Sequence, residues 1–231
     1  MSLKISAENL LPVDPEENCQ YSRFDQLNPN WWRLVKSLTA TTPGELFSQV
    51  RVVDNGLELP WFNRRLRLEP ETFSISFDSG RGVQPTYQDG LVVLALLNYL
   101  AESRNFPESL GLINENHLVG GTTFFRGPHV MASVRVAHCY AKDGDKFLQA
   151  GSRWGGKQVD FGEFALSFTV LPGLDWIVAL WEEDDEFPAR AQYLFDKNLE
   201  QIFQLDVIWA LGNVVATKML TYDTNQVKFI V

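Results

Sequence analysis

Apolar and polar residues alternate with a period of two in the first third of the chain, which is the pattern of half-buried β-strands. Residues 50–53, 57–62, 65–68 and 73–77 follow this pattern. Turn signals separate the first three segments, the clearest being Asp54-Asn55-Gly56. We therefore expect an antiparallel meander with one buried face.

A second alternating group lies near the C-terminal end. Residues 164–170 alternate large apolar side chains with small or polar ones. Pro172-Gly173, a signal for a type II turn, is followed by another strand-like run at residues 174–181. The pattern predicts a hairpin of these two strands, with residues 191–195 as a third strand beside it.

Residues 91–103 are apolar on nearly all sides, which predicts a buried central helix. Thr86 and Asp89 precede this run and resemble a capping box, with Asp in place of the usual Glu or Gln. The helix is therefore expected to begin just after Thr86.

Weaker signals predict further helices. Asn28-Pro29 can begin a helix, and a short one is expected over residues 44–49. Pro128 is expected to begin a helix that runs through Tyr140. A shorter helix follows and ends at Gly155-Gly156, a plausible C-terminal cap.

The C-terminal segment predicts two more helices, with Asp196 and Asp206 as their N-caps. Residues 226–231 are expected to form a terminal strand. The longer helix has apolar residues at helical spacing, namely Val207, Leu211, Val215 and Met219.

These elements predict an α+β fold in which antiparallel sheet segments surround a buried central helix, with helices packed on one side. Residues 1–28 are interpreted as an irregular lead-in. Residues 29–231 are expected to form a single domain with two sub-lobes, at about 29–103 and 117–231. The pattern leaves open whether the two sheet segments form one sheet.

The charge of the chain argues against a nucleic-acid partner. Its formal net charge is −9 and its pI is about 4.9, whereas phosphate binding needs clustered Lys and Arg. We find neither a secretory signal nor a run long enough to span a bilayer. Cys19 and Cys139 allow one disulfide, but two free thiols in a reducing cytoplasm are the favoured interpretation. We expect a cytoplasmic protein.

Five motifs support a family resemblance: ELPWFNRRLRL, DGLVVLALLNYL, GGTTF, FGEFALSF and VALWEEDDEFPARAQYLFD. Over roughly residues 45–220 the chain resembles a prokaryotic domain family of unknown function, found mainly in anaerobic bacteria and archaea. Some members of that family carry an appended iron–sulfur-cluster segment of the kind seen in corrinoid-pathway proteins. The resemblance implies no reaction and no catalytic residue.

The positions that match the family's pattern are Gly120, Gly121, Phe124, Gly162, Trp181, Asp185, Glu186, Phe187, Pro188, Phe195 and Asp196. The chain lacks the four closely spaced cysteines of the cluster-bearing members. We therefore expect it to hold no cysteine-ligated cluster, and we expect no cofactor.

The densest chemical feature is the acidic run from Glu182 to Glu186. It can be a solvated loop, a site for a hard cation or cationic ligand, or a partner contact. The run lacks the spacing and glycine of a calcium loop, and the solvated loop is favoured. Phe187 and Phe195 are expected to fill the core, and Pro188 to fix the exit of the loop.

The histidines predict no metal site. His129 and His138 are nine residues apart on the helix expected after Pro128, so they would face opposite sides of it. Gly120-Gly121 is interpreted as a tight turn, because the segment lacks the lysine and spacing of a phosphate loop.

The favoured hypothesis is an accessory or binding module that recognises a small ligand or a protein partner in anaerobic metabolism. The alternative is an enzyme whose site lies between the sub-lobes and uses an Asp or Glu general base. A homodimer formed through exposed aromatic residues is a third hypothesis. The candidate ligand-binding residues are Thr123, Arg126, His129, Trp181, Asp185 and Glu186.

Overall fold

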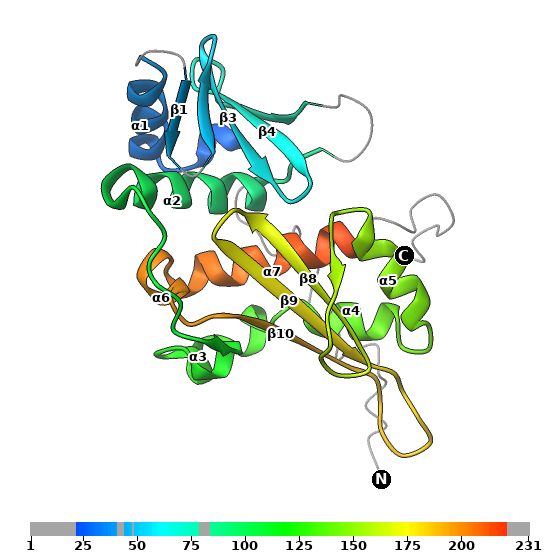
Figure 1. Cartoon of the computed structure of the whole chain (residues 1–231). Coiled ribbons are helices and arrows are strands. Elements are labelled where there is room, and N and C mark those ends of the chain that lie inside the picture. The colour runs from blue at the N-terminus through cyan, green and yellow to red at the C-terminus, as the bar shows by residue number, and fades with distance from the viewer. Residues whose placement is uncertain (1–21, 41–43, 48, 79–83, 221–231) are drawn as a thin grey trace.

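Two five-stranded antiparallel sheets and seven α-helices make up the part of the chain that the structure describes (Figure 1). A computed structural model describes residues 22–40, 44–47, 49–78 and 84–220. The predicted α+β class is confirmed, and the sheet segments form two separate sheets. The predicted terminal strand at 226–231 and Cys19 lie outside the described residues.

The first sheet is the predicted meander. Its strands run in sequence order, β1 to β5, and each pairs antiparallel with the next. Leu57 pairs with Leu68, and Leu66 with Phe77, so one face carries a continuous apolar layer. The strands are β1 (Gly44–Phe47), β2 (Val50–Val53), β3 (Gly56–Trp61), β4 (Arg64–Glu69) and β5 (Ser74–Phe77).

The short helix predicted over residues 44–49 is wrong, because residues 44–47 form β1 and Gln49 lies in a turn. Gly44 pairs with Val52, and Phe47 with Val50. Gln49, between the strands, has a φ of 63°, a left-handed conformation that a helix does not contain. Pairing with β2 thus outweighs the weak local helical signal.

Two helices cover the apolar face of this sheet. Helix α1 (Pro29–Thr39) begins as predicted, since the Asn28 side chain accepts a hydrogen bond from the Asn30 backbone N–H. The Trp32 indole N–H donates to the carbonyl of Phe24, which lies in the 3₁₀ turn η2 (Phe24–Gln26). Residues at the end of the predicted lead-in are therefore part of the packed structure.

Helix α2 (Tyr87–Ser103) is the predicted buried central helix. The capping box is confirmed: the Thr86 hydroxyl accepts from the Asp89 N–H, and the Asp89 carboxylate accepts from the Thr86 N–H. Helix α2 lies between the first sheet and α7 (Leu205–Leu220) (Figure 1). Because the first sheet covers one side of α2 and α7 covers the other, the helix is apolar on nearly all of its faces.

The second sheet has the order β6-β10-β9-β8-β7. Strands β8 (Phe164–Leu171) and β9 (Leu174–Trp181) form the predicted hairpin, and Gly173 in its turn has a φ of 96°. Strand β10 (Arg190–Asp196) pairs with β9, as expected. Two short edge strands complete the sheet, β6 (Leu112–Ile113) and β7 (Lys157–Gln158).

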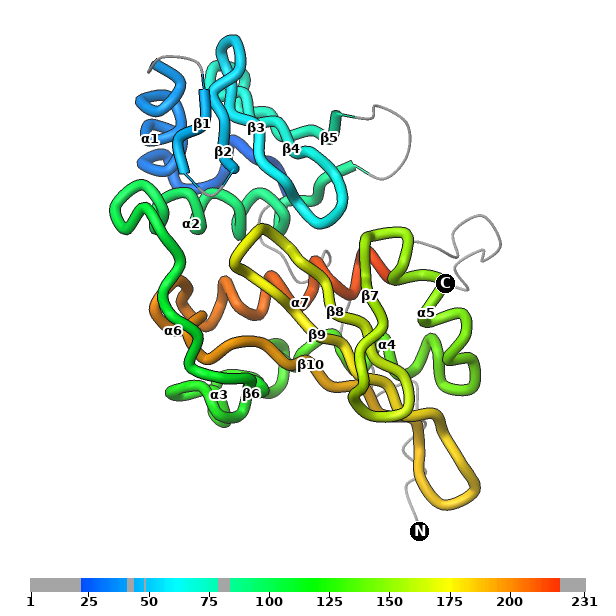
Figure 2. The backbone as a smooth tube through the Cα atoms, viewed as in Figure 1, coloured from blue at the N-terminus to red at the C-terminus, as the bar shows by residue number. Residues whose placement is uncertain are grey.

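Helices α4 (Ser133–Cys139), α5 (Gly144–Ser152) and α7 pack on the second sheet (Figure 2). The continuous helix predicted from Pro128 to Tyr140 is wrong. Pro128 lies in a 3₁₀ turn, η4 (Gly127–His129), and Val130 then has a ψ of 135°. This extended residue allows Met131 to become buried, next to Gly212 of α7.

The N-caps predicted for the last two helices are also wrong. Asp196 is the last residue of β10, and helix α6 (Leu199–Ile202) has Asn198 as its N-cap residue. Asp206 lies inside the first turn of α7, where its carboxylate accepts from the Val207 N–H. The predicted apolar stripe of α7 is confirmed as buried.

The turn between β3 and β4 joins the two halves of the molecule. Phe62 has a φ of 55°, and its N–H donates to the carbonyl of Val170 in β8 at 2.8 Å. The side-chain amide of Asn63 donates to the carbonyl of Arg153 at 2.9 Å. The motif ELPWFNRRLRL therefore contains a structural contact between the sheets. None of the described helices has both the length and the apolar character needed to cross a bilayer.

Candidate functional site

The six candidate ligand-binding residues fall into two groups that the structure keeps apart. Thr123, Arg126 and His129 lie in and after α3 (Gly121–Phe124), beyond the C-terminal end of β10. Trp181, Asp185 and Glu186 lie before its N-terminal end. A strand of seven residues spans about 20 Å, and Figure 1 shows α3 and the β9–β10 loop at opposite ends of the sheet.

His129 belongs to an aromatic cluster. Its ring stacks on Phe124 with 4.5 Å between centroids and meets Trp209 edge to face at 5.5 Å. The Trp209 indole N–H donates to the carbonyl of Val130. These contacts place the imidazole in the packing between α3 and α7, while Thr123 and Arg126 are exposed.

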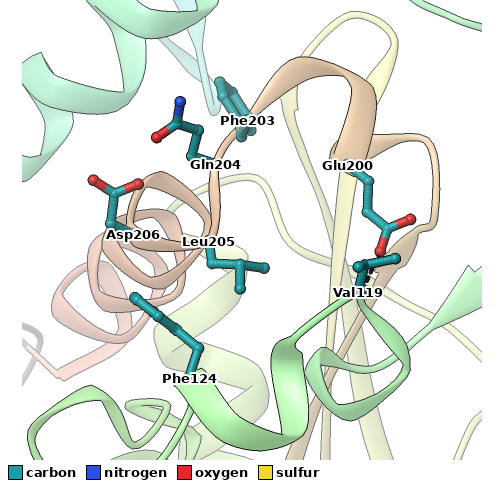
Figure 3. Close-up of a pocket in the computed structure, with 7 residues that line it drawn as sticks. All are labelled: Val119, Phe124, Glu200, Phe203, Gln204, Leu205 and Asp206. Atoms are coloured by element: carbon teal, nitrogen blue, oxygen red, sulfur yellow. Dashed lines mark hydrogen bonds between the residues drawn. The ribbon is translucent and has the colours of Figure 1, made fainter.

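A shallow pocket of about 720 Å³ lies beside this cluster (Figure 3). Leu205 and Phe124 supply apolar surface, and Glu200 lies across from Asp206. The Glu200 carboxylate accepts a hydrogen bond from the Val119 N–H, and that of Asp206 accepts from the Val207 N–H. Both carboxylates that line the pocket therefore already accept hydrogen bonds from nearby backbone N–H groups.

Glu115 is a residue that the sequence reasoning missed. It lies in the 3₁₀ turn η3 (Glu115–His117), and burial raises the pKa of its carboxyl. The neighbouring Gly120 has a φ of 79°, so the tight turn predicted there is confirmed. A Cβ on Gly121 would lie 2.0 Å from the carbonyl oxygen of Glu115, which indicates very close packing of this turn.

The acidic run forms the loop between β9 and β10, and three of its side chains fix the loop. Glu182 accepts from the Gly144 N–H at 2.6 Å, and Glu183 pairs with Lys142 at 2.9 Å. One oxygen of Asp184 accepts from the N–H groups of both Glu186 and Phe187.

Asp185 and Glu186 are exposed, as the solvated-loop interpretation expects. Within the described residues, no group of three or more His, Cys, Asp or Glu side chains is arranged to hold a metal ion. His138 and Cys139 are exposed at the end of α4, on a different element from His129.

A groove of about 590 Å³ lies at the base of this loop. Trp181 and Arg190 pair across the strands, and the guanidinium lies over the indole ring at 4.1 Å. Phe161 meets the same indole edge to face, and Gly162 packs against it. Lining the groove are Glu163, Trp181, Glu182, Asp184, Phe187, Pro188, Ala189 and Arg190.

The prediction that Phe187 fills the core is wrong, because 66% of this residue is exposed. Strand pairing ends at Trp181 and Arg190, so the loop projects beyond the sheet (Figures 1 and 2). The bonds to Asp184 turn the chain there, and none of the described strands covers Phe187. Phe195, by contrast, is fully buried, as predicted.

Residues 46–218 match the model of a family described as "Domain of unknown function (DUF3786)". The match includes the second sheet, the β9–β10 loop and all of the first sheet except the start of β1, and it confirms the expected resemblance to a domain family of unknown function. Neither a curated protein nor a solved structure matches the chain.

Proposed function

We propose that this chain, which belongs to the DUF3786 family, is a binding module that docks a partner protein through the groove beside the β9–β10 loop. The observation that carries the proposal is the exposure of Phe187 next to the half-buried Trp181 in that groove. Aromatic side chains of this kind, near a depression, are the usual anchors of protein interfaces.

The loop supports docking because its shape is fixed before a partner arrives. The carboxylate of Asp184 holds the loop backbone, that of Glu182 ties the loop to the Gly144 N–H, and Arg190 holds the indole of Trp181. A preformed surface has few groups left to order when a partner binds. The entropy cost of binding, which offsets part of the interaction free energy, is therefore smaller. The fixed loop therefore holds Phe187 in an exposed position.

Binding is also favoured over catalysis by the separation of the candidate acid–base groups. A general base must lie within hydrogen-bond reach of the reacting proton, together with the groups that assist it. Asp185 and Glu186 lie at one end of the second sheet, and His129 lies at the other. The alternative enzyme with these residues in one site has no support in this arrangement.

We further propose that the module is cytoplasmic and that its partner belongs to anaerobic metabolism. This part of the proposal is supported only by the resemblance of the five motifs to a family of anaerobic bacteria and archaea. It does not affect the location of the groove.

Site-specific photo-crosslinking in cells that naturally produce the protein tests the docking proposal. A benzophenone amino acid would replace Phe187, and the control would carry it at Leu110, which is 57% exposed and lies beyond the opposite end of β10. We expect a protein adduct from position 187 that is absent from position 110. Equal adducts from both positions, or none from 187, would contradict the proposal.

A further inference from the structure

The chemistry of the groove indicates what kind of partner it receives. Three carboxylates line it, from Glu163, Glu182 and Asp184, and Arg190 is the one cation among the described lining residues. Asp185 and Glu186 add two exposed charges on the same loop. The groove therefore presents an excess of negative charge around an apolar centre.

The internal hydrogen bonds of these acids use only part of their capacity. Glu163 accepts from the Glu182 N–H, and Glu182 accepts from the Gly144 N–H, each through a single oxygen. Asp184 likewise uses one oxygen. Backbone N–H groups are neutral donors, so these bonds position the carboxylates without cancelling their charge.

Arg190 offsets only one of the three negative charges that line the groove. Its guanidinium lies 4.1 Å from the centroid of the Trp181 ring, its partner across the strands. A cation held on an aromatic face is attracted by the ring and fixed in place. The surface of Phe187 remains available for an apolar side chain or for a second cation.

We propose that the occupant of this groove is a basic segment of a partner protein, with an apolar side chain on Phe187 and Lys or Arg side chains facing the acids. The inference rests on the docking function proposed above. Charge complementarity carries it, because acids surround the apolar contact. A nucleic acid would bring phosphates to this surface, and a second copy docking by the same face would bring the same acids.

Fluorescence anisotropy with a defined probe tests the inference. The probe is a labelled, capped peptide of alternating lysine and leucine. The comparison peptides carry glutamate in place of every lysine, or serine in place of every leucine. We expect the wild-type chain to bind the first peptide most tightly and to lose affinity between about 50 and about 300 mM salt, as exposed charges are screened.

Matched variants locate the binding. Asp185→Asn/Glu186→Gln removes two charges from the loop, and Glu102→Gln/Glu108→Gln removes two exposed charges elsewhere. The loop variant should weaken binding roughly fivefold at low salt, and the control by less than about twofold. Equal effects of the two variants, or equal binding of the lysine and glutamate peptides, would overturn the inference.

The outcomes separate this inference from the docking proposal. A heterologous adduct at position 187 without preference for the basic peptide rejects the basic partner and keeps the docking site. If peptide binding depends on the loop acids but no adduct forms in cells, the docking function is rejected. The preference of the groove for a basic, apolar segment is then retained. An adduct that joins two copies of this chain overturns the inference in favour of self-association.

Discussion

The ammonium group of Lys218 lies 2.8 Å from the carboxylate of Asp89, and both side chains are completely buried. The same carboxylate accepts from the indole N–H of Trp61 at 2.7 Å. Asp89 also caps its own helix through Thr86. One carboxylate therefore links α2, the first sheet and α7, and it fixes the two halves of the molecule to each other.

Removing the cation from this pair should destabilise the fold strongly. Lys218→Met leaves a buried carboxylate without its counter-charge, and we expect it to lower the free energy of unfolding by about 3–5 kcal/mol. Urea unfolding provides the measurement. Lys36→Met breaks the exposed pair with Glu71 and should cost less than about 1 kcal/mol. Similar losses in the two variants would contradict a structural role for the buried pair.

A methyl group at Gly121 should not fit. A Cβ there would lie 2.0 Å from the carbonyl oxygen of Glu115, a backbone atom that cannot move without shifting the turn. We expect Gly121→Ala to lower the thermal midpoint and to cost about 1–3 kcal/mol, as overpacking does. Thr122→Ala, at an exposed position of the same helix, is the control and should change little. An unchanged Gly121→Ala protein would argue against this packing.

Asp196 should make stability depend on pH in the acid range. Partial burial alone would raise the pKa of its carboxyl, but hydrogen bonds from the Ser109 hydroxyl and from backbone N–H groups outweigh it, and the pKa is lowered. A carboxyl with a lowered pKa in the folded state stabilises the fold above its ordinary pKa of about 4. That contribution is lost as the pH falls through the folded-state pKa.

The variant Asp196→Asn isolates this effect. It should be less stable than the wild type at neutral pH, and the difference should shrink as the pH is lowered below about 4. Urea midpoints measured across this range give the comparison, with the exposed Asp145→Asn as a reference. A difference that is constant with pH would show that the charge of Asp196 does not contribute.

Local patterns predicted most of the fold, because strands and caps are encoded by neighbouring residues. The alternation at 164–170 and the Thr86–Asp89 capping box are signals of this kind, and both are confirmed. The role of Asp89 as a partner of Lys218 could not be predicted, because 129 residues separate the two. Only the packing of α2 against α7 brings them together.

The errors arose where distant pairing or loop geometry decided the outcome. Residues 44–47 form a strand because β2 offers them hydrogen bonds. Phe187 was expected in the core from its hydrophobicity, yet the turn at Asp184 holds it beyond the last pair of the hairpin. Of the candidate ligand-binding residues, Trp181 lines the groove, but the sequence does not reveal that Arg190 lies on its indole.

Native mass spectrometry of the protein, purified gently and anaerobically from its own host, tests the docking function most directly. The wild type, Phe187→Ser and Leu110→Ser would be compared after circular dichroism has shown equal folding. The account predicts a reproducible protein-sized additional mass on the wild type and on Leu110→Ser that is lost from Phe187→Ser. A bare wild-type chain, or an additional mass that survives in Phe187→Ser, would contradict it.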